Sequence, residues 1–278
     1  MLNFTKMQSL GNDFVMLDGV RQEIRLSSQQ LRFIADRNRG VGCDQVLMAQ
    51  PAQHAGADFR FRIYNADGSE AGQCGNGARC FARYLLQKGL TDKSEIRIEI
   101  PGGMADLHLL VDGDVRVNMG VPVFDPQSIP LSREKMATDY TLSVDEQLFC
   151  FAALSMGNPH AVIRVDDTDR YPVHSVGPGI SNHEVFPDRC NVGFMQVVSA
   201  GQIRLRVYER GVGETLACGS GACAAVVAGR RWGILQESVI VQLPGGKLQI
   251  EWAGQGESVW MTGPTEHVYE GTIELTTL

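Results

Sequence analysis

The feature that most constrains the fold of this chain is an internal repeat. A heptapeptide rich in cysteine and glycine occurs twice, as Cys-Gly-Asn-Gly-Ala-Arg-Cys at residues 74–80 and as Cys-Gly-Ser-Gly-Ala-Cys-Ala at residues 218–224. Four further matches keep the same order at offsets of 143 to 146 residues: 9–12 with 155–158, 63–65 with 207–209, Pro101 with Pro244, and Gly120 with Gly263. This period is far longer than the roughly 20–50 residues of solenoid repeats. The repeat therefore predicts two copies of one α+β lobe.

The boundaries of the two lobes follow from the same repeat. Residues 120–145, with three prolines, are typical of a connection between halves. We expect a first lobe of residues 1–118 plus 264–278 and a second lobe of residues 119–263. A strand expected at residues 272–275 would return the tail to the first lobe, and the two lobes should face each other across a cleft.

The composition excludes several classes of function. The chain has 278 residues, a net charge of −7 and no cluster of Lys and Arg, which argues against a nucleic-acid or anionic-membrane partner. Its start is unlike a signal peptide, and no apolar run approaches the roughly 20 residues of a membrane span. The seven cysteines are odd in number and lack the spacing of a zinc site. We therefore expect a cytoplasmic protein with reduced thiols and no metal.

The cysteine that opens each heptapeptide, Cys74 or Cys218, is the leading catalytic candidate. Each precedes a predicted helix, at residues 78–88 and 222–232, and a helix N-terminus has unsatisfied N–H donors that favour an anion or a thiolate. One thiolate can remove a proton from one face of a carbon acid while the other thiol protonates the opposite face. The backbone N–H groups of Gly75-Asn76 and Gly219-Ser220 could hold the substrate carboxylate and the charge that develops on it.

These motifs together resemble those of the diaminopimelate epimerase family over nearly the whole chain. Besides residues 74–80, the resemblance rests on residues 11–14 (Gly-Asn-Asp-Phe), 65–69 (Asn-Ala-Asp-Gly-Ser), 157–160 (Gly-Asn-Pro-His), 208–211 (Tyr-Glu-Arg-Gly) and 217–221 (Ala-Cys-Gly-Ser-Gly). The cysteine motifs alone also admit proline racemase-like relatives, which share the two-lobe fold. The resemblance implies an α+β fold of two homologous, pseudo-symmetric lobes, each a mixed β-sheet or roll wrapped around a central helix.

The resemblance also implies an activity. A member of this family is a cofactor-independent isomerase, a two-base amino-acid epimerase that needs no pyridoxal phosphate. It interconverts LL- and meso-diaminopimelate in the biosynthesis of lysine and peptidoglycan precursors, in the cytoplasm. The resemblance further suggests a homodimer, with Tyr269 near the contact.

By similarity, Cys74 and Cys218 form the acid/base pair, and His160 and Glu209 tune the cysteines. The residues that would bind substrate are Asn12, Gln45, Asn65, Gly75, Asn76, Asn158, Asn191, Glu209, Arg210, Gly219 and Ser220. A substrate with two ammonium and two carboxylate groups needs neutral amides, one cation and one anion, and Arg210 and Glu209 are the charged pair. Asn65 and Glu209 stand at equivalent positions of the repeat yet differ, as expected for an asymmetric substrate.

Simpler interpretations exist for several of these residues. A single cysteine is more often a buried small residue than a catalyst, and that is the expectation for Cys80, Cys150 and Cys223. The resemblance implies no role for Cys43 or Cys190, which could instead add sensitivity to oxidation. Without the family, a lone histidine is usually structural, an asparagine can serve a turn, and an arginine can lie on the surface.

Two other functions remain open from the residues alone. Residues 219–224 fit a loose dinucleotide fingerprint, but that motif needs a strand directly before it. An amino-acid binding protein with two lobes and a cleft is the rival of a different class. It leaves the paired cysteines unexplained, and solvent deuterium appearing at the α-carbon of the substrate would exclude it.

Overall fold

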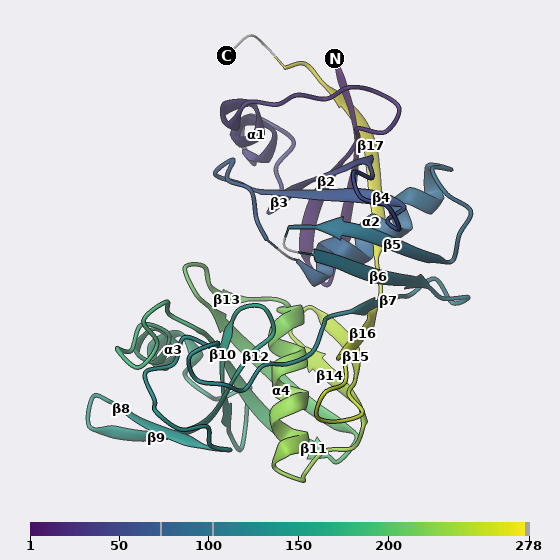
Figure 1. Ribbon diagram of the computed structural model, residues 1–278. Coiled ribbons are helices and arrows are strands. Elements are labelled where there is room, and N and C mark those ends of the chain that lie inside the picture. The colour runs from purple at the N-terminus through teal and green to yellow at the C-terminus, as the bar shows by residue number, and fades with distance from the viewer. Residues whose placement is uncertain (73, 102, 276–278) are drawn as a thin grey trace. The chain divides into compact units, whose positions relative to one another are not determined.

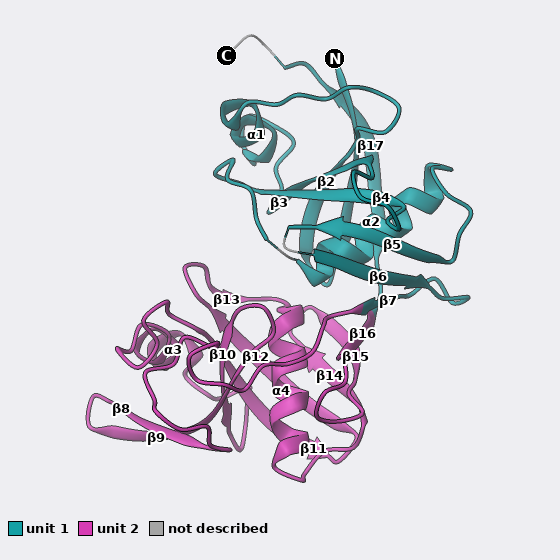
Figure 2. Cartoon of the chain, viewed as in Figure 1, with its two compact units in different colours: residues 1–117, 263–278 teal, residues 118–262 magenta. Residues whose placement is uncertain are grey.

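The computed structural model describes residues 1–72, 74–101 and 103–275 of the chain. They form two compact units, Met1–Val117 with the segment from Gly263 onward, and Asn118–Thr262 (Figure 2). The second unit is therefore inserted into the first. The boundaries between the units follow Val117 and Thr262, each one residue before the expected boundary. No helix in the described part of the chain is long and apolar enough to cross a membrane.

The first unit is a mixed sheet with the strand order β17-β1-β2-β3-β4-β5-β6-β7 (Figure 1). The β2–β3 and β4–β5 pairs are parallel, and the other pairs are antiparallel. The strands are β1 (Leu2–Ser9), β2 (Asn12–Asp18), β3 (Gln45–Pro51), β4 (Phe59–Asn65), β5 (Glu95–Ile100), β6 (Gly103–Leu109), β7 (Val115–Asn118) and β17 (Glu266–Ile273). The terminal strand β17 pairs with β1, and it begins six residues before the expected start at residue 272.

The second unit repeats this sheet with the order β8-β9-β10-β11-β12-β14-β15-β16. Its parallel pairs, β10–β11 and β12–β14, stand at the same places in the order as those of the first unit. The strands are β8 (Tyr140–Val144), β9 (Gln147–Ser155), β10 (Pro159–Arg164), β11 (Asn191–Ser199), β12 (Gln202–Glu209), β13 (Gly213–Thr215), β14 (Ser238–Leu243), β15 (Gly246–Glu251) and β16 (Trp260–Gly263). The short β13 forms a hairpin with the end of β12. The predicted duplication of one α+β lobe is confirmed at the level of strand order.

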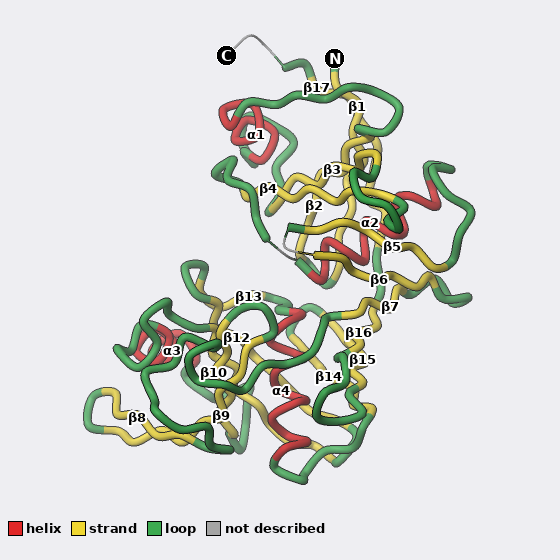
Figure 3. Tube along the Cα trace, in the orientation of Figure 1, coloured by secondary structure: helices red, strands yellow, loops and turns green. Residues whose placement is uncertain are grey.

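Each sheet packs around one long helix, α2 (Gly75–Gln87) in the first unit and α4 (Gly219–Arg231) in the second (Figures 1 and 3). Helix α2 contacts β1, β2, β3 and β6, and α4 contacts β9, β10, β11, β12 and β15. Nearly every residue of α4 from Gly221 to Gly229 is buried, as expected of a helix inside a curved sheet. Both helices begin three residues before the predicted start, because the glycines adopt helical backbone and the preceding cysteine becomes the N-cap.

The two shorter helices differ in how well the local sequence predicts them. Helix α1 (Ser28–Ala35) begins with a capping box in which Ser27 and Gln30 each bind the other's backbone N–H. Helix α3 (Val173–Ser181) contains Pro178 between two glycines, a sequence with low helix propensity. Packing explains it: a Cβ on Gly177 would lie 2.6 Å from the ring of Tyr208 on β12, so glycine permits this close approach.

Candidate active site

The two repeated cysteines occupy the same place in the two units, as N-caps of α2 and α4. The Cys74 Sγ accepts a hydrogen bond from the backbone N–H of Gly77 at 3.3 Å. A Cβ on Gly77 would lie 3.5 Å from that sulfur, and a Cβ on Gly221 would lie 3.3 Å from the Cys218 sulfur and 3.0 Å from Val207. The second glycine of each motif therefore lets the first turn of the helix close against the sulfur.

In the first unit, polar side chains gather at one end of the sheet. Asn12 begins β2, Gln45 begins the parallel strand β3, and Asn65 ends the antiparallel strand β4. The Gln45 side chain donates to Asn65 Oδ1 at 3.0 Å. The Cys74 thiol donates to Asn12 Oδ1 at 3.7 Å, and Asn76 Nδ2 donates to the same oxygen at 3.3 Å. The site residues expected in this unit thus form two hydrogen-bonded groups at one edge.

The second unit places its candidates at the equivalent strand ends. Asn158 precedes β10, Asn191 begins β11 and Glu209 ends β12. Asn158 Nδ2 donates to Ser220 Oγ at 3.4 Å, and Ser220 Oγ lies 3.7 Å from Cys218 Sγ. Asn12 and Asn158 are therefore matched residues, each linked to the first turn of its helix.

The charged candidates belong to the second unit. Glu209 Oε1 accepts a hydrogen bond from the Thr215 hydroxyl at 2.5 Å, across the β12–β13 hairpin. The backbone N–H of Arg210 donates to Asn191 Oδ1 at 2.9 Å, and its guanidinium donates to the Asp188 carbonyl at 3.1 Å. At the matching positions the first unit carries Asn65 and Ala66, so the two half-sites differ in charge at these positions although their folds match.

The electrostatic environment of Cys218 differs from the sequence-based expectation. The residue is only 4% exposed, and this burial raises the pKa of its thiol well above the ordinary value, with the nearby Glu209 carboxylate adding to the effect. Hydrogen bonds from Ser220 and Gly221 act in the opposite direction but are weaker. Burial of the Cys218 thiol therefore opposes the stabilisation of a thiolate that the helix start favours.

His160 is a buried, neutral histidine. Burial, and then the positive charge of Arg210, lower its pKa to about 3. Its Nε2 lies 3.0 Å from Asn158 Oδ1, and it is paired in register with Asn191. Its contact with the cysteine half-site thus runs through Asn158, whose other amide atom reaches Ser220.

The remaining cysteines divide by burial. Cys80 and Cys223 are buried, as expected, and so are Cys43 and Cys190. Burial raises the pKa of Cys43 to about 12 and also raises those of Cys80 and Cys190. Cys150 was expected to be buried but is exposed, because it lies on the outward face of β9.

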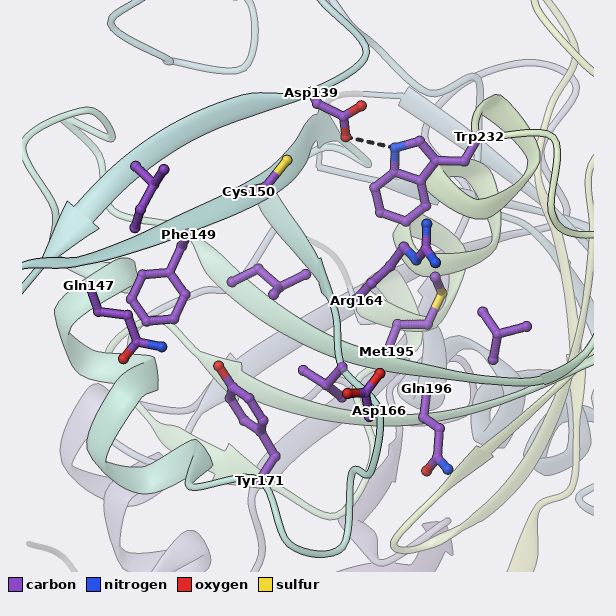
Figure 4. Close-up of a pocket in the computed structure, with 14 residues that line it drawn as sticks. Asp139, Gln147, Phe149, Cys150, Arg164, Asp166, Tyr171, Met195, Gln196 and Trp232 are labelled. Carbon is purple, nitrogen blue, oxygen red and sulfur yellow. Dashed lines mark hydrogen bonds between the residues drawn. The ribbon is translucent and has the colours of Figure 1, made fainter.

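A pocket of about 710 Å³ lies in the second unit and is lined by residues of β9, β10 and β11 together with Trp232 (Figure 4). The Trp232 indole N–H donates to Asp139 at 2.7 Å, and Cys150 lies beside this pair. None of the candidate site residues lines this pocket. The cavity and the repeated motifs are therefore separate features of the second unit. Within the described residues no three His, Cys, Asp or Glu side chains are grouped to hold a metal ion.

Three polar residues of the half-sites were missed by sequence reasoning. Arg79 and Asp44 bind the side chains of Asn76 and Asn12, and Thr215 binds Glu209. Arg79 lies inside the repeated heptapeptide, and Asp44 directly precedes Gln45, so their positions in motifs were the available signal. Thr215 had no such signal, because its contact depends on the β12–β13 hairpin.

Comparison with known proteins identifies the family. The sequence profile of diaminopimelate epimerase matches residues 4–124 and 152–268. The chain belongs to the diaminopimelate epimerase family. It is 57% identical over 276 residues to the diaminopimelate epimerase of Alkalilimnicola ehrlichii and 55% identical over 274 residues to that of Nitrosospira multiformis, covering 99% of both chains in each case.

Solved structures confirm the diaminopimelate epimerase-like fold. A probable proline racemase from Agrobacterium radiobacter matches with a TM-score of 0.71 at 15% identity, covering 99% of this chain and 93% of the other. Identity at this level shows a shared fold and nothing about a shared substrate. The resemblance found in the sequence motifs is thus confirmed for both the family and the architecture.

Glu209→Gln should lower the pKa of the Cys218 thiol, because it removes the carboxylate that disfavours the thiolate. The rate of alkylation of Cys218 is measured as a function of pH by peptide mass spectrometry. We expect the pH at the midpoint of this curve to fall by about one pH unit. Glu214→Gln is the control, since Glu214 lies in the same hairpin but pairs with Arg206. An unchanged midpoint in Glu209→Gln would remove Glu209 from the environment of the thiol.

Proposed function

We propose that Cys74 and Cys218 are the acid/base pair of a cofactor-independent epimerisation of LL-diaminopimelate to meso-diaminopimelate. The chain is an isomerase of the diaminopimelate epimerase family, and its substrate is diaminopimelate, in lysine biosynthesis. The observation that carries the assignment is that each cysteine is the N-cap of the matching helix in one of two repeated units. Supply of peptidoglycan precursors is part of the same proposal.

The proposed reaction balances without any cofactor. One cysteine thiolate takes the α-proton, so a C–H bond breaks and an S–H bond forms, and the electron pair moves onto the substrate carboxylate. The other cysteine thiol then returns a proton to the opposite face of the same carbon. The raised pKa of Cys218 makes it the proton-carrying partner in the free protein. Turnover in the reverse direction starts from the opposite protonation states.

The proposed carboxylate site is the first turn of each helix. Gly75, Asn76, Gly219 and Ser220 carry the first backbone N–H donors of α2 and α4. Such donors stabilise charge that develops on the carboxylate oxygens when the α-proton leaves. Because the α-carbon is a weak acid, stabilising this charge is the most difficult task of the proposed site.

The rest of the substrate would be bound by the other polar residues of the two half-sites. Glu209 would accept from an ammonium group, and Arg210 would bind the distal carboxylate. The neutral groups would complete the hydrogen bonds: Asn12, Gln45 and Asn65 from the first unit, Asn158 and Asn191 from the second. At the positions of Glu209 and Arg210 the first unit carries the neutral residues Asn65 and Ala66, which supports recognition of a molecule whose two ends differ at the reacting centre.

The location and the rival function belong to this proposal as well. The seven cysteines are all free thiols, which supports a reducing compartment such as the cytoplasm. A two-lobe amino-acid binding protein would also use such half-sites, but it has no use for two matched sulfurs. Incubation with LL-diaminopimelate in heavy water separates these functions, because only the epimerase incorporates deuterium at the α-carbon.

Cys74→Ala and Cys218→Ala should each reduce epimerisation by more than about 100-fold, because either change removes one of two obligatory proton carriers. The measurement is conversion of LL- to meso-diaminopimelate at saturating substrate. Cys150→Ala is the matched control and should keep full activity, since Cys150 is exposed on β9 and lies outside both repeated motifs. Substantial turnover in either of the first two variants would contradict the two-base assignment.

Mild peroxide should inactivate the free enzyme by joining Cys74 to Cys218. In this step two thiols lose two protons and two electrons, and the peroxide is reduced to two molecules of water. Both sulfurs must reach one carbon in the proposed site, so in the absence of substrate only a short approach separates them. Dithiothreitol should restore activity, and bound substrate should protect it.

Peptide mapping of the inactivated enzyme tests this disulfide. A cross-linked pair containing Cys74 and Cys218 is the expected result. The competing account is oxidation at Cys43 or Cys190, or at the helix cysteines Cys80 and Cys223, all of which are buried. Inactivation without that cross-link would contradict the proposal that the two sulfurs serve one carbon.

We also propose a homodimer, in which the exposed face of β17 contributes to the contact. Val268 and Tyr269 are exposed on this strand, and the Tyr269 ring packs edge-on against Phe4 at 5.9 Å. Sedimentation at micromolar concentration should give twice the 30.4 kDa mass of one chain, and Tyr269→Ala should shift the protein toward the monomer. A monomer of the unmodified chain under these conditions would contradict the proposal.

A further inference from the structure

Arg79 is a fully buried arginine beneath the first turn of α2. Its Nη2 donates to Ser9 Oγ at 2.6 Å and to Asn76 Oδ1 at 2.8 Å, and its Nη1 approaches the Gly75 carbonyl at 3.5 Å. A guanidinium placed inside a protein is costly unless its hydrogen bonds are made. Arg79 therefore ties the end of β1 to two residues that follow Cys74 directly.

The guanidinium determines which way the Asn76 side chain points. Arginine carries only donors, so the Asn76 atom that faces it must be the oxygen. The amide nitrogen of Asn76 is then directed to the other side, where it donates to Asn12 Oδ1 at 3.3 Å. An inverted Asn76 amide would set its N–H groups against the guanidinium and its oxygen against Asn12 Oδ1, so both hydrogen bonds would be lost.

The contacts of Asn12 with Asp44, at the other end of this chain of hydrogen bonds, independently require the same orientation of the amides. Asn12 Nδ2 donates to Asp44 Oδ2 at 2.7 Å, and Arg37 donates to Asp44 Oδ1 at 2.7 Å. A carboxylate only accepts hydrogen bonds, so the Asn12 nitrogen must face Asp44. Its oxygen is thereby left facing Asn76 and Cys74. Arg79 at one end and Asp44 at the other therefore require the same orientation of the Asn76 and Asn12 side-chain amides.

We propose that Arg79 is a positioning residue for the epimerisation, acting through the Asn76 amide. By holding Asn76 Oδ1, it directs the Asn76 amide N–H groups and the Asn12 oxygen toward Cys74, and it holds the first turn of α2 in place for the substrate carboxylate. The inference rests on the proposed function, in which Asn76 and Asn12 contact substrate.

The second unit supports the idea that this orientation matters. The residue equivalent to Arg79 in the repeat is the buried Cys223, which cannot perform the same task. There Asn158, the match of Asn12, is held instead by the buried His160 at 3.0 Å. Asn158 is thus oriented by a buried histidine, whereas its match Asn12 is oriented by Asp44 and, through Asn76, by Arg79.

A double-mutant cycle tests the proposal with the full-length enzyme. Arg79→Met, Asn76→Ala and the double variant are compared for kcat and KM with LL-diaminopimelate, and for melting temperature. We expect Arg79→Met to lower kcat/KM at least tenfold, and we expect no further loss when it is added to Asn76→Ala, because Arg79 acts through that amide. Arg79→Lys should recover part of the loss, since its ammonium still donates to one oxygen.

Leu85→Ala controls for instability, because Leu85 is fully buried in the same helix two turns from its start. It should lower the melting temperature while kcat/KM per folded molecule stays unchanged. If Arg79→Met does not fold, Arg79→Lys takes its place in the cycle.

Each outcome has a distinct meaning. Full activity in the Arg79 variant, or an equal loss with and without Asn76, would overturn the positioning role. Full activity in Asn76→Ala alone would also overturn it, because that variant keeps the backbone N–H and loses only the side-chain amide through which Arg79 is proposed to act. A fall in melting temperature with unchanged kcat/KM would show that Arg79 only stabilises the fold.

Discussion

The structure of each half-site depends on the unsatisfied backbone donors at the start of a buried helix. The first N–H groups of α2 and α4 have no partner within the helix, and the helix start carries about half a positive charge. A cysteine N-cap and two glycines leave those donors accessible, where a larger side chain would cover them. The sheet contributes strand ends beside each helix start: Asn12 accepts from the Cys74 thiol, and Asn158 donates to Ser220 beside Cys218. The chemistry is therefore a property of where the helix begins, and the rest of the unit holds that start in place.

The same backbone arrangement supports two different electrostatic environments. Around Cys218, burial and the Glu209 carboxylate disfavour the thiolate. The Cys74 thiol donates to Asn12 Oδ1, and the charged side chains of Arg79 and Asp44 bind the amides of Asn76 and Asn12. A two-base reaction needs one proton donor and one acceptor at the same time. Different surroundings for two equivalent cysteines meet that need without different folds.

Sequence reasoning reached the features that depend on local rules and on repetition. The duplicated lobe, the helix starts and the site candidates at Cys74 and Cys218 all follow from motif spacing. Helix α3 was not predictable, because Gly177, Pro178 and Gly179 disfavour a helix and the packing of Gly177 against Tyr208 compensates. The raised pKa of Cys218 and the exposure of Cys150 were not predictable either, since each depends on tertiary burial. The orientation of the Asn76 and Asn12 amides was not predictable, because it depends on hydrogen bonds to Arg79 and Asp44, which come from distant segments of the chain.

The insertion of one unit into the other has a consequence for assembly. All strands of the second unit are contiguous in sequence, from β8 to β16, so that unit can complete its sheet without residues from elsewhere. In the first unit, β1 pairs with β2 from the same segment and with β17 from the end of the chain. The outer edge of β1 therefore stays open until the last residues arrive, and open strand edges promote aggregation. Ser9 ends β1 and binds Arg79, so closing that edge with β17 also secures the support of the first half-site.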